Sequence, residues 1–146
     1  MKNIFISFVF VFYSFFSFSS HFMGGEITWE CIKAGPDVGK YIFQMKVYRD
    51  CNGITFSQTS QTLDAHNYPS PGSQTPILLN FISITDISPD GSILSGNNCF
   101  DCASGQLGAV EEYVWRSDPT IMVGTPPAEG WHFTWGSCCR SSSIDN

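Results

Sequence analysis

The sequence predicts an all-β chain, an immunoglobulin-like sandwich of antiparallel strands that disulfides hold together. Apolar and polar residues alternate over residues 41–49, and this is the period of a half-buried strand. Other short apolar runs are separated by turns rich in glycine and proline. No stretch of a dozen residues carries the apolar stripe of an amphipathic helix. These three observations favour strands throughout the chain.

The expected strands follow one another with turn residues between them. They are residues 24–30, 41–49, 54–63, 77–87, 110–116, 120–123 and 131–135. The loops between them are residues 33–39, 65–76, 88–91 and 124–130. The first two strands are expected to pair as a hairpin. In the second of them, alternate side chains are expected to face one way, namely Tyr41, Phe43, Met45 and Val47.

Residues 1–19 have the features of a secretory signal peptide. Lys2 gives a positive start, residues 4–18 carry almost no polar side chains, and Ser17 and Ser19 are the small residues before a cleavage site. The alternative is a transmembrane anchor, but this run is shorter than the roughly 18 to 20 residues that a spanning helix needs. We therefore expect cleavage after Ser19, a domain over residues 20–146, and no membrane span in the mature chain.

Length and composition exclude several classes of protein. The 146 residues fit one domain, and 42 % hydrophobic residues are too many for a disordered acidic tail. The formal net charge of -6 argues against a nucleic-acid partner, because binding to a phosphate backbone needs a surplus of Lys and Arg.

Six cysteines remain after the expected cleavage, and an even number in an exported chain indicates disulfides. The alternative is a cysteine-rich zinc-binding module, because Cys99 and Cys102 have the C-x-x-C spacing of half a zinc site. Adjacent cysteines make poor joint ligands, so we favour bridges, with no metal or other cofactor. The candidate disulfide residues are Cys31, Cys51, Cys99, Cys102, Cys138 and Cys139.

Hairpin geometry narrows the pairings. Cys31 and Cys51 would lie at opposite ends of the first hairpin, roughly 30 Å apart, whereas a disulfide needs Cα atoms within about 7 Å. Our preferred set joins Cys99 to Cys102, and joins Cys31 and Cys51 to the adjacent pair Cys138 and Cys139.

Trp131, Phe133 and Trp135 share one face of the last expected strand. Such a row of rings can stack on sugars, so Trp131 and Trp135 are the candidate ligand-binding residues. Core packing is the favoured alternative for all three, and also for Trp29 and Trp115, because large aromatic side chains dominate protein cores.

We expect no catalytic residues. Glu111 and Glu112 are adjacent, so on a strand they point to opposite faces and cannot act as a carboxylate pair. No Gly-x-Ser-x-Gly elbow is present. Asp86, Asp90 and Asp101 do not match the calcium-loop pattern, and a solvated turn is favoured for them over a calcium site. Arg49-Asp50 and Arg140 are expected to form local ion pairs beside the disulfides.

Five short motifs follow one another along the chain: SHFMGGEITWEC at residues 20–31, VYRDC at 47–51, NNC at 97–99, VEEYVW at 110–115 and CCR at 138–140. Together they resemble a family of large exported surface proteins from gliding Gram-negative bacteria. The first motif is similar to the start of the mature chain in that family, and the others are similar to later landmarks in the same order. Two features depart from the family pattern: Cys102 is separated from the VEE strand, and serines follow CCR.

The resemblance implies the N-terminal module of a longer protein. Members of the family carry PKD or other Ig-like modules and end in a gliding-motility-associated domain that routes them through type IX secretion. We therefore expect a secreted or outer cell-surface module with an adhesin-like binding or structural role, and with an extracellular glycan or protein as partner. The remaining alternative is an accessory region of a secreted glycan-active enzyme.

Overall fold

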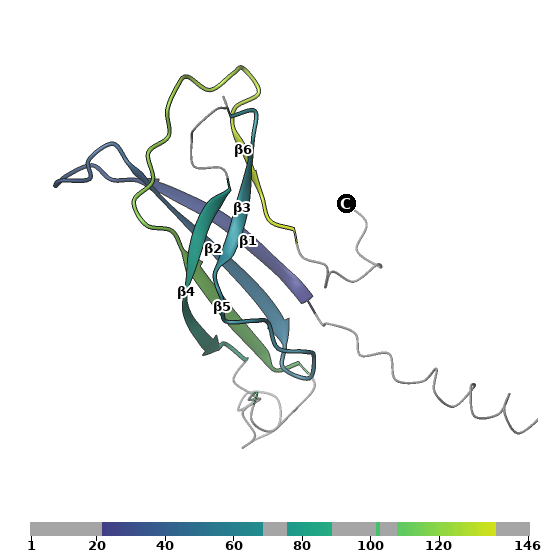
Figure 1. Cartoon of the computed structure of the whole chain (residues 1–146). Coiled ribbons are helices and arrows are strands. Elements are labelled where there is room, and N and C mark those ends of the chain that lie inside the picture. The colour runs from purple at the N-terminus through teal and green to yellow at the C-terminus, as the bar shows by residue number, and fades with distance from the viewer. Residues whose placement is uncertain (1–21, 69–75, 89–101, 103–107, 137–146) are drawn as a thin grey trace, which may run out of the picture.

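The structure is a computed structural model that describes residues 22–68, 76–88, 102 and 108–136. All the regular elements in these ranges are strands (Figure 1). They are β1 (Phe22–Cys31), β2 (Tyr41–Asp50), β3 (Gln61–His66), β4 (Ile77–Asp86), β5 (Val110–Arg116) and β6 (His132–Thr134). Within the same ranges the chain forms no helix with the length and hydropathy that a membrane crossing requires. The expected leader lies outside the described residues.

The strands form one sheet in the order β1-β2-β5-β4-β3-β6. Every neighbouring pair is antiparallel. The prediction of an all-β, antiparallel fold is therefore confirmed. The predicted hairpin is also present, since β1 pairs with β2 from Phe22↔Arg49 to Cys31↔Tyr41.

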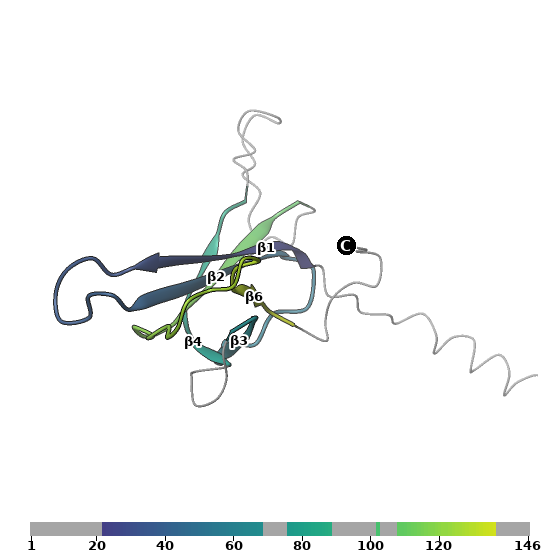
Figure 2. The same ribbon diagram turned by 90° about the horizontal axis from the view of Figure 1, so that it is seen from above.

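The sheet folds over on itself at β4. The first residues of β4, Ile77 to Leu79, pair only with β3, whereas Asn80 to Asp86 pair only with β5. A register shift between Phe81 and Ser83 accompanies this change of partner, and such bulges bend strands. As a result β3 and β6 lie over the face of β2 and form a second layer (Figures 1 and 2).

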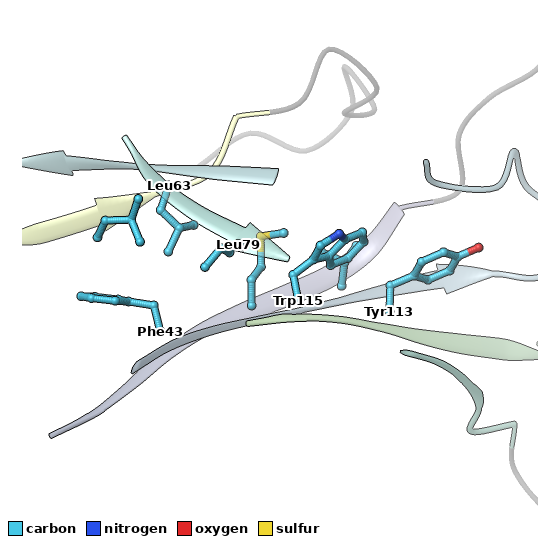
Figure 3. Close-up of a cluster of buried hydrophobic side chains, with 8 residues drawn as sticks. Phe43, Leu63, Leu79, Tyr113 and Trp115 are labelled. Atoms are coloured by element: carbon cyan, nitrogen blue, oxygen red, sulfur yellow. The ribbon is translucent and has the colours of Figure 1, made fainter. Parts of the chain in front are cut away.

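The hydrophobic core lies between these two layers. Leu63 and Leu79 project from β3 and β4 toward Phe43, Tyr113 and Trp115 on β2 and β5 (Figure 3). All five side chains are at most 1 % exposed. The predicted alternation of β2 is confirmed at its centre, where Phe43, Met45 and Val47 are buried. The arrangement is layered like a sandwich, but the two layers are parts of one continuous sheet, and the immunoglobulin-like topology remains a prediction.

Two predicted strands differ from the structure. Strand β3 begins at Gln61, so residues 54–60 are not part of a strand. This segment contacts the core through two of its residues. The Phe56 ring packs edge-on against Tyr113, and the Thr59 carbonyl accepts a hydrogen bond from the indole of Trp115 (2.9 Å). It therefore covers one end of the core without joining a ladder.

The short strand expected at residues 120–123 is also wrong. Only Thr120 pairs, through an isolated bridge to Tyr41 at the start of β2. In that register residues 121–123 would lie opposite residues 38–40, which belong to the loop before β2 and offer no strand to pair with.

Candidate functional site

A half-open apolar groove lies between β1 and the end of β6. Its volume is about 670 Å³. Among the described strands, β1 pairs only with β2 and β6 only with β3, so the groove separates the two free edges of the folded sheet. Its apolar lining comes from both edges and from the floor between them: Phe22, Ile27, Met45, Phe56, Phe133 and Trp135.

The groove is continuous with the aromatic core. The Phe22 ring contacts Trp135 and Phe56, with ring centroids 6.1 and 6.3 Å apart. At the other side, Phe133 packs on Phe43 at 4.7 Å. Because these rings rest on buried residues, the groove walls are held by packing and are formed before any ligand arrives.

Strand β1 follows β2 closely beside the groove. A Cβ atom on Gly25 would lie 2.6 Å from the carbonyl oxygen of Lys46, so a side chain at this position would push β1 away from β2. Glycine at this position therefore keeps the groove wall in place.

The two tryptophans predicted as ligand-binding residues lie in different places. Trp135 lines the groove, and its indole N–H donates to Gln61 Oε1 (3.1 Å). Trp131 lies elsewhere, with its ring 5.2 Å from that of Tyr68. The indole nitrogen of Trp131 is buried and has no hydrogen-bond partner among the described residues. The structure therefore places Trp135 in the candidate site and leaves Trp131 outside it.

The preference for core packing is confirmed for most of the aromatic residues. Trp115 is 1 % exposed, and Phe133 and Trp135 pack against the core from partly buried positions. It is wrong for Trp29, which is 59 % exposed. Trp29 lies on β1, at the edge of the sheet that the described strands form, and its ring has contact with Phe133 at 5.9 Å.

Charged residues form a network on the face of the sheet opposite the core, across β1, β2 and β5. Lys46 Nζ lies 3.0 Å from Glu112 and 3.9 Å from Glu26. The hydrogen bond and the negative charge of Glu112 raise the pKa of Lys46 above its ordinary 10.5. Desolvation raises the pKa of Tyr48 above 10.0, and the charge of Glu26 adds to this effect. Lys46 therefore remains a cation on the outer face of the sheet.

A disulfide joins Cys51, at the end of β2, to Cys102, with Cα atoms 5.1 Å apart. The preferred pairings of Cys99 with Cys102, and of Cys51 with the Cys138-Cys139 pair, are therefore wrong. The expectation that Cys31 and Cys51 do not pair is confirmed. Cys31 has an exposed sulfur with no sulfur partner in the described part of the chain, and Cys99, Cys138 and Cys139 lie outside that part.

A buried ion pair lies beside this bridge. Arg49 is 3 % exposed, and its Nη2 lies 2.5 Å from Glu111 on the neighbouring strand β5. The same guanidinium donates to the carbonyl groups of Cys51 and Gly53, and it lies 6.0 Å from the centre of the Tyr113 ring. Burial raises the pKa of Tyr113 above 10.0, so this ring stays neutral. The expectation of an ion pair beside the disulfides is confirmed at Arg49, whereas Arg140 lies outside the described residues.

The carboxylates do not converge on one catalytic position. Glu111 bonds to Arg49 and Glu112 to Lys46, on opposite faces of β5, as predicted. Asp86 accepts hydrogen bonds from Ser88 and from the backbone N–H of Cys102 (2.8 Å), while Asp90 and Asp101 lie outside the described residues. Asp86 therefore orders the turn after β4 and the bridged cysteine, in agreement with the turn interpretation.

One cluster of three groups of the kind that bind metals occurs within the described ranges, formed by Cys51, Cys102 and Glu111. The two sulfurs are joined to each other, and the carboxylate is bonded to Arg49, so the cluster presents no thiolate ligands. Its observed role is to fasten the ends of β2 and β5.

Sequence reasoning missed the groove because two distant segments form it. The sequence contains one sign of the groove. Phe22, Ile27 and Phe56 are apolar residues outside residues 41–49, where the alternation is clearest, and all three line the groove. Nothing in the sequence shows that β6 faces β1. Comparisons of the chain with protein-family models, with curated proteins and with solved structures find no significant match.

Proposed function

We propose that this chain is a non-catalytic, exported binding module that accepts an extended polypeptide segment in the groove between β1 and β6. The observation that carries the proposal is the groove itself, which is apolar, preformed, and bounded by two strand edges. A strand edge offers backbone N–H and C=O groups at regular spacing, and proteins use such edges to add a strand from a partner.

The chemistry of the groove favours a polypeptide over a glycan. An added strand satisfies its backbone on β1 and places every second side chain toward the groove floor, where Ile27, Met45 and Phe56 lie. A sugar needs several convergent polar groups. The indole N–H of Trp135 is already bonded to Gln61, and the ring lies against Phe22. Apolar side chains in alternation therefore fit this surface better than hydroxyl groups.

Export to the cell surface is the second part of the proposal. The leader-like segment at residues 1–19, the resemblance to exported surface proteins, and the bridge between Cys51 and Cys102 support it. The bridge also weakens the zinc-module alternative, because Cys102 bonded to Cys51 is not available as a thiolate beside Cys99. An adhesin-like role follows if the bound segment belongs to another surface protein.

Selection of random decapeptides displayed on phage tests the groove. We expect the selected peptides to share alternating apolar positions and to lose affinity when alternate backbone nitrogens are methylated, since methylation removes the donors that pair with a strand edge. Trp135→Ala and Ile27→Lys are each expected to weaken binding at least about tenfold, a change of about 1.4 kcal/mol.

Ile121→Lys is the matched control, because Ile121 is 52 % exposed and does not line the groove. It should bind the selected peptides as the unchanged chain does. Peptides that bind the Ile27→Lys chain with undiminished affinity contradict the groove as the site, as does a selection that yields no binder.

A further inference from the structure

We propose that His66 and His132 form a two-histidine site for a divalent transition-metal ion on the outer face of the β3–β6 pair. These two strands lie near each other at one end of the molecule (Figure 1). His66 and His132 are directly opposite each other in the antiparallel register, although 66 residues separate them in sequence. Opposite residues have Cβ atoms about 4.5–5.5 Å apart, and at that spacing two imidazoles can share one ion.

Both rings face solvent. Phe133 packs inward against the core, so its neighbours on β6, His132 and Thr134, point outward. The register places Asp64 opposite Thr134 on the same face. All four of these side chains are exposed, so an ion can reach the two rings without displacing any packed group.

Hydrogen bonds leave one nitrogen of each ring available. His132 Nε2 lies 2.8 Å from the carbonyl oxygen of Glu129. A carbonyl only accepts, so the proton is assigned to Nε2 and the lone pair to Nδ1. His66 Nε2 lies 2.7 Å from Thr134 Oγ1, which can accept in the same way. Histidines that bind metals commonly donate their second N–H to a carbonyl or a similar acceptor, and this bond fixes the tautomer.

The donor set indicates the class of ion. Imidazole nitrogens suit zinc, copper and nickel, whereas calcium and magnesium prefer oxygen. Asp64 does not complete a close cluster of three ligands with the two rings in the described structure, so water molecules fill the remaining positions on the ion. The bound ion would tie β6, a strand of three residues, to β3, and so stiffen the wall that carries Phe133 and Trp135.

Calorimetric titration with NiCl₂ tests the site on the full oxidised chain, purified with a tag that contains no histidine and with free thiols alkylated. We expect one Ni²⁺ per chain. His66→Gln and His132→Gln are each expected to weaken binding at least about tenfold. His21→Gln is the matched control, because His21 is the one remaining histidine of the sequence and belongs to neither β3 nor β6. It should bind like the unchanged chain.

Electron paramagnetic resonance of the Cu²⁺-loaded chain gives a second readout that does not depend on affinity. We expect hyperfine splitting from two imidazole nitrogens in the unchanged chain and from one in each single variant. An unchanged chain that binds no Ni²⁺, variants that bind as it does, or loss of binding in His21→Gln overturns the proposal. Since the metal site and the peptide groove are tested by different variants, either proposal can fail alone.

Discussion

Arg49 shows how one residue links the sheet to its covalent bridge. Its side chain is 3 % exposed and that of Glu111 is 16 % exposed, so the pair lies largely out of water. Removal of one partner from a buried pair is costly because the other charge stays behind without compensation. Here the carbonyl groups of Cys51 and Gly53 would also lose their donor.

We expect Arg49→Met to lower the free energy of unfolding by about 2–4 kcal/mol, somewhat less than for a fully buried pair because Glu111 keeps partial contact with water. Urea denaturation measures the change. Arg116→Met is the matched control, since the Arg116–Glu30 pair is 44 % and 65 % exposed and should contribute less than about 1 kcal/mol. Equal losses in the two variants would show that the burial of Arg49 has no energetic consequence.

Asp86 makes the stability of the fold depend on pH in the acid range. The hydrogen bond from the Ser88 side chain, followed by those from the backbone N–H groups of Cys102 and Ser88, lowers the pKa of Asp86 below 3.8. A lowered pKa in the folded state contributes stability that is present above the unfolded value and is lost as the pH falls through the folded value. The contribution of Asp86 should therefore decline as the pH falls below about 4 and be lost only below the folded-state pKa.

A carbon-detected NMR titration of the Asp86 carboxyl group checks this expectation. We predict a midpoint below 3.8 in the unchanged chain and a higher midpoint in Ser88→Ala, because the largest cause of the shift is then removed. Ser57→Ala is the control, since Ser57 bonds to Thr59 and not to Asp86. An Asp86 midpoint that Ser88→Ala leaves unchanged is inconsistent with the proposed cause.

Strand β4 belongs to both layers, because its first residues pair with β3 and its later residues with β5. Its neighbouring residues Leu78 and Leu79 differ sharply, with 54 % and 0 % of their surface exposed. We predict that Leu79→Ala destabilises the fold by about 2–5 kcal/mol, because it opens a cavity between the layers. Leu78→Ala should cost less than about 1 kcal/mol. Thermal unfolding compares the two, and a larger loss at Leu78 would reverse the assignment of the faces of β4.

The strands that the sequence predicts best are those with local signals. Alternation locates β2, and the run from Val110 to Arg116 matches β5 at both ends. The strand predicted over residues 54–60 is wrong. The β-branched residues of this segment suit a strand, but in the fold it contacts side chains of the core instead: the Phe56 ring packs on Tyr113, and the Thr59 carbonyl accepts from the Trp115 indole. The sequence also does not show that Trp29 is exposed, because its exposure depends on the position of β1 at the edge of the sheet. Pairing partners are tertiary facts that periodicity does not contain.

The bridge between Cys51 and Cys102 closes a loop of 51 residues that includes β3 and β4. A cross-link stabilises the fold mainly by reducing the freedom of the unfolded chain. We expect Cys51→Ala combined with Cys102→Ala to lower the free energy of unfolding by about 2–4 kcal/mol. Guanidinium denaturation under oxidising conditions measures the loss, and equal stability with and without the bridge would contradict its structural role.

The candidate site was only partly predictable. Aromatic character singled out Trp131 and Trp135, yet only Trp135 reaches the groove. The expectation of disulfides is confirmed by one bridge, between Cys51 and Cys102. Its partners were not predicted, because local spacing favoured Cys99 with Cys102. The sequence pattern shows which face of each strand is apolar. It does not show which of these faces pack together, because that depends on how the sheet folds over at β4.

We propose that this chain is exported, and that it carries a sulfur bridge between Cys51 at the end of β2 and Cys102 after β4. Mass spectrometry of non-reduced peptides from the protein exported by its host tests it most directly. We predict a chain that begins at Ser20 and a linked peptide pair that contains Cys51 and Cys102. A chain that retains Met1, with both of these cysteines open to alkylation before reduction, would contradict both export and the bridge.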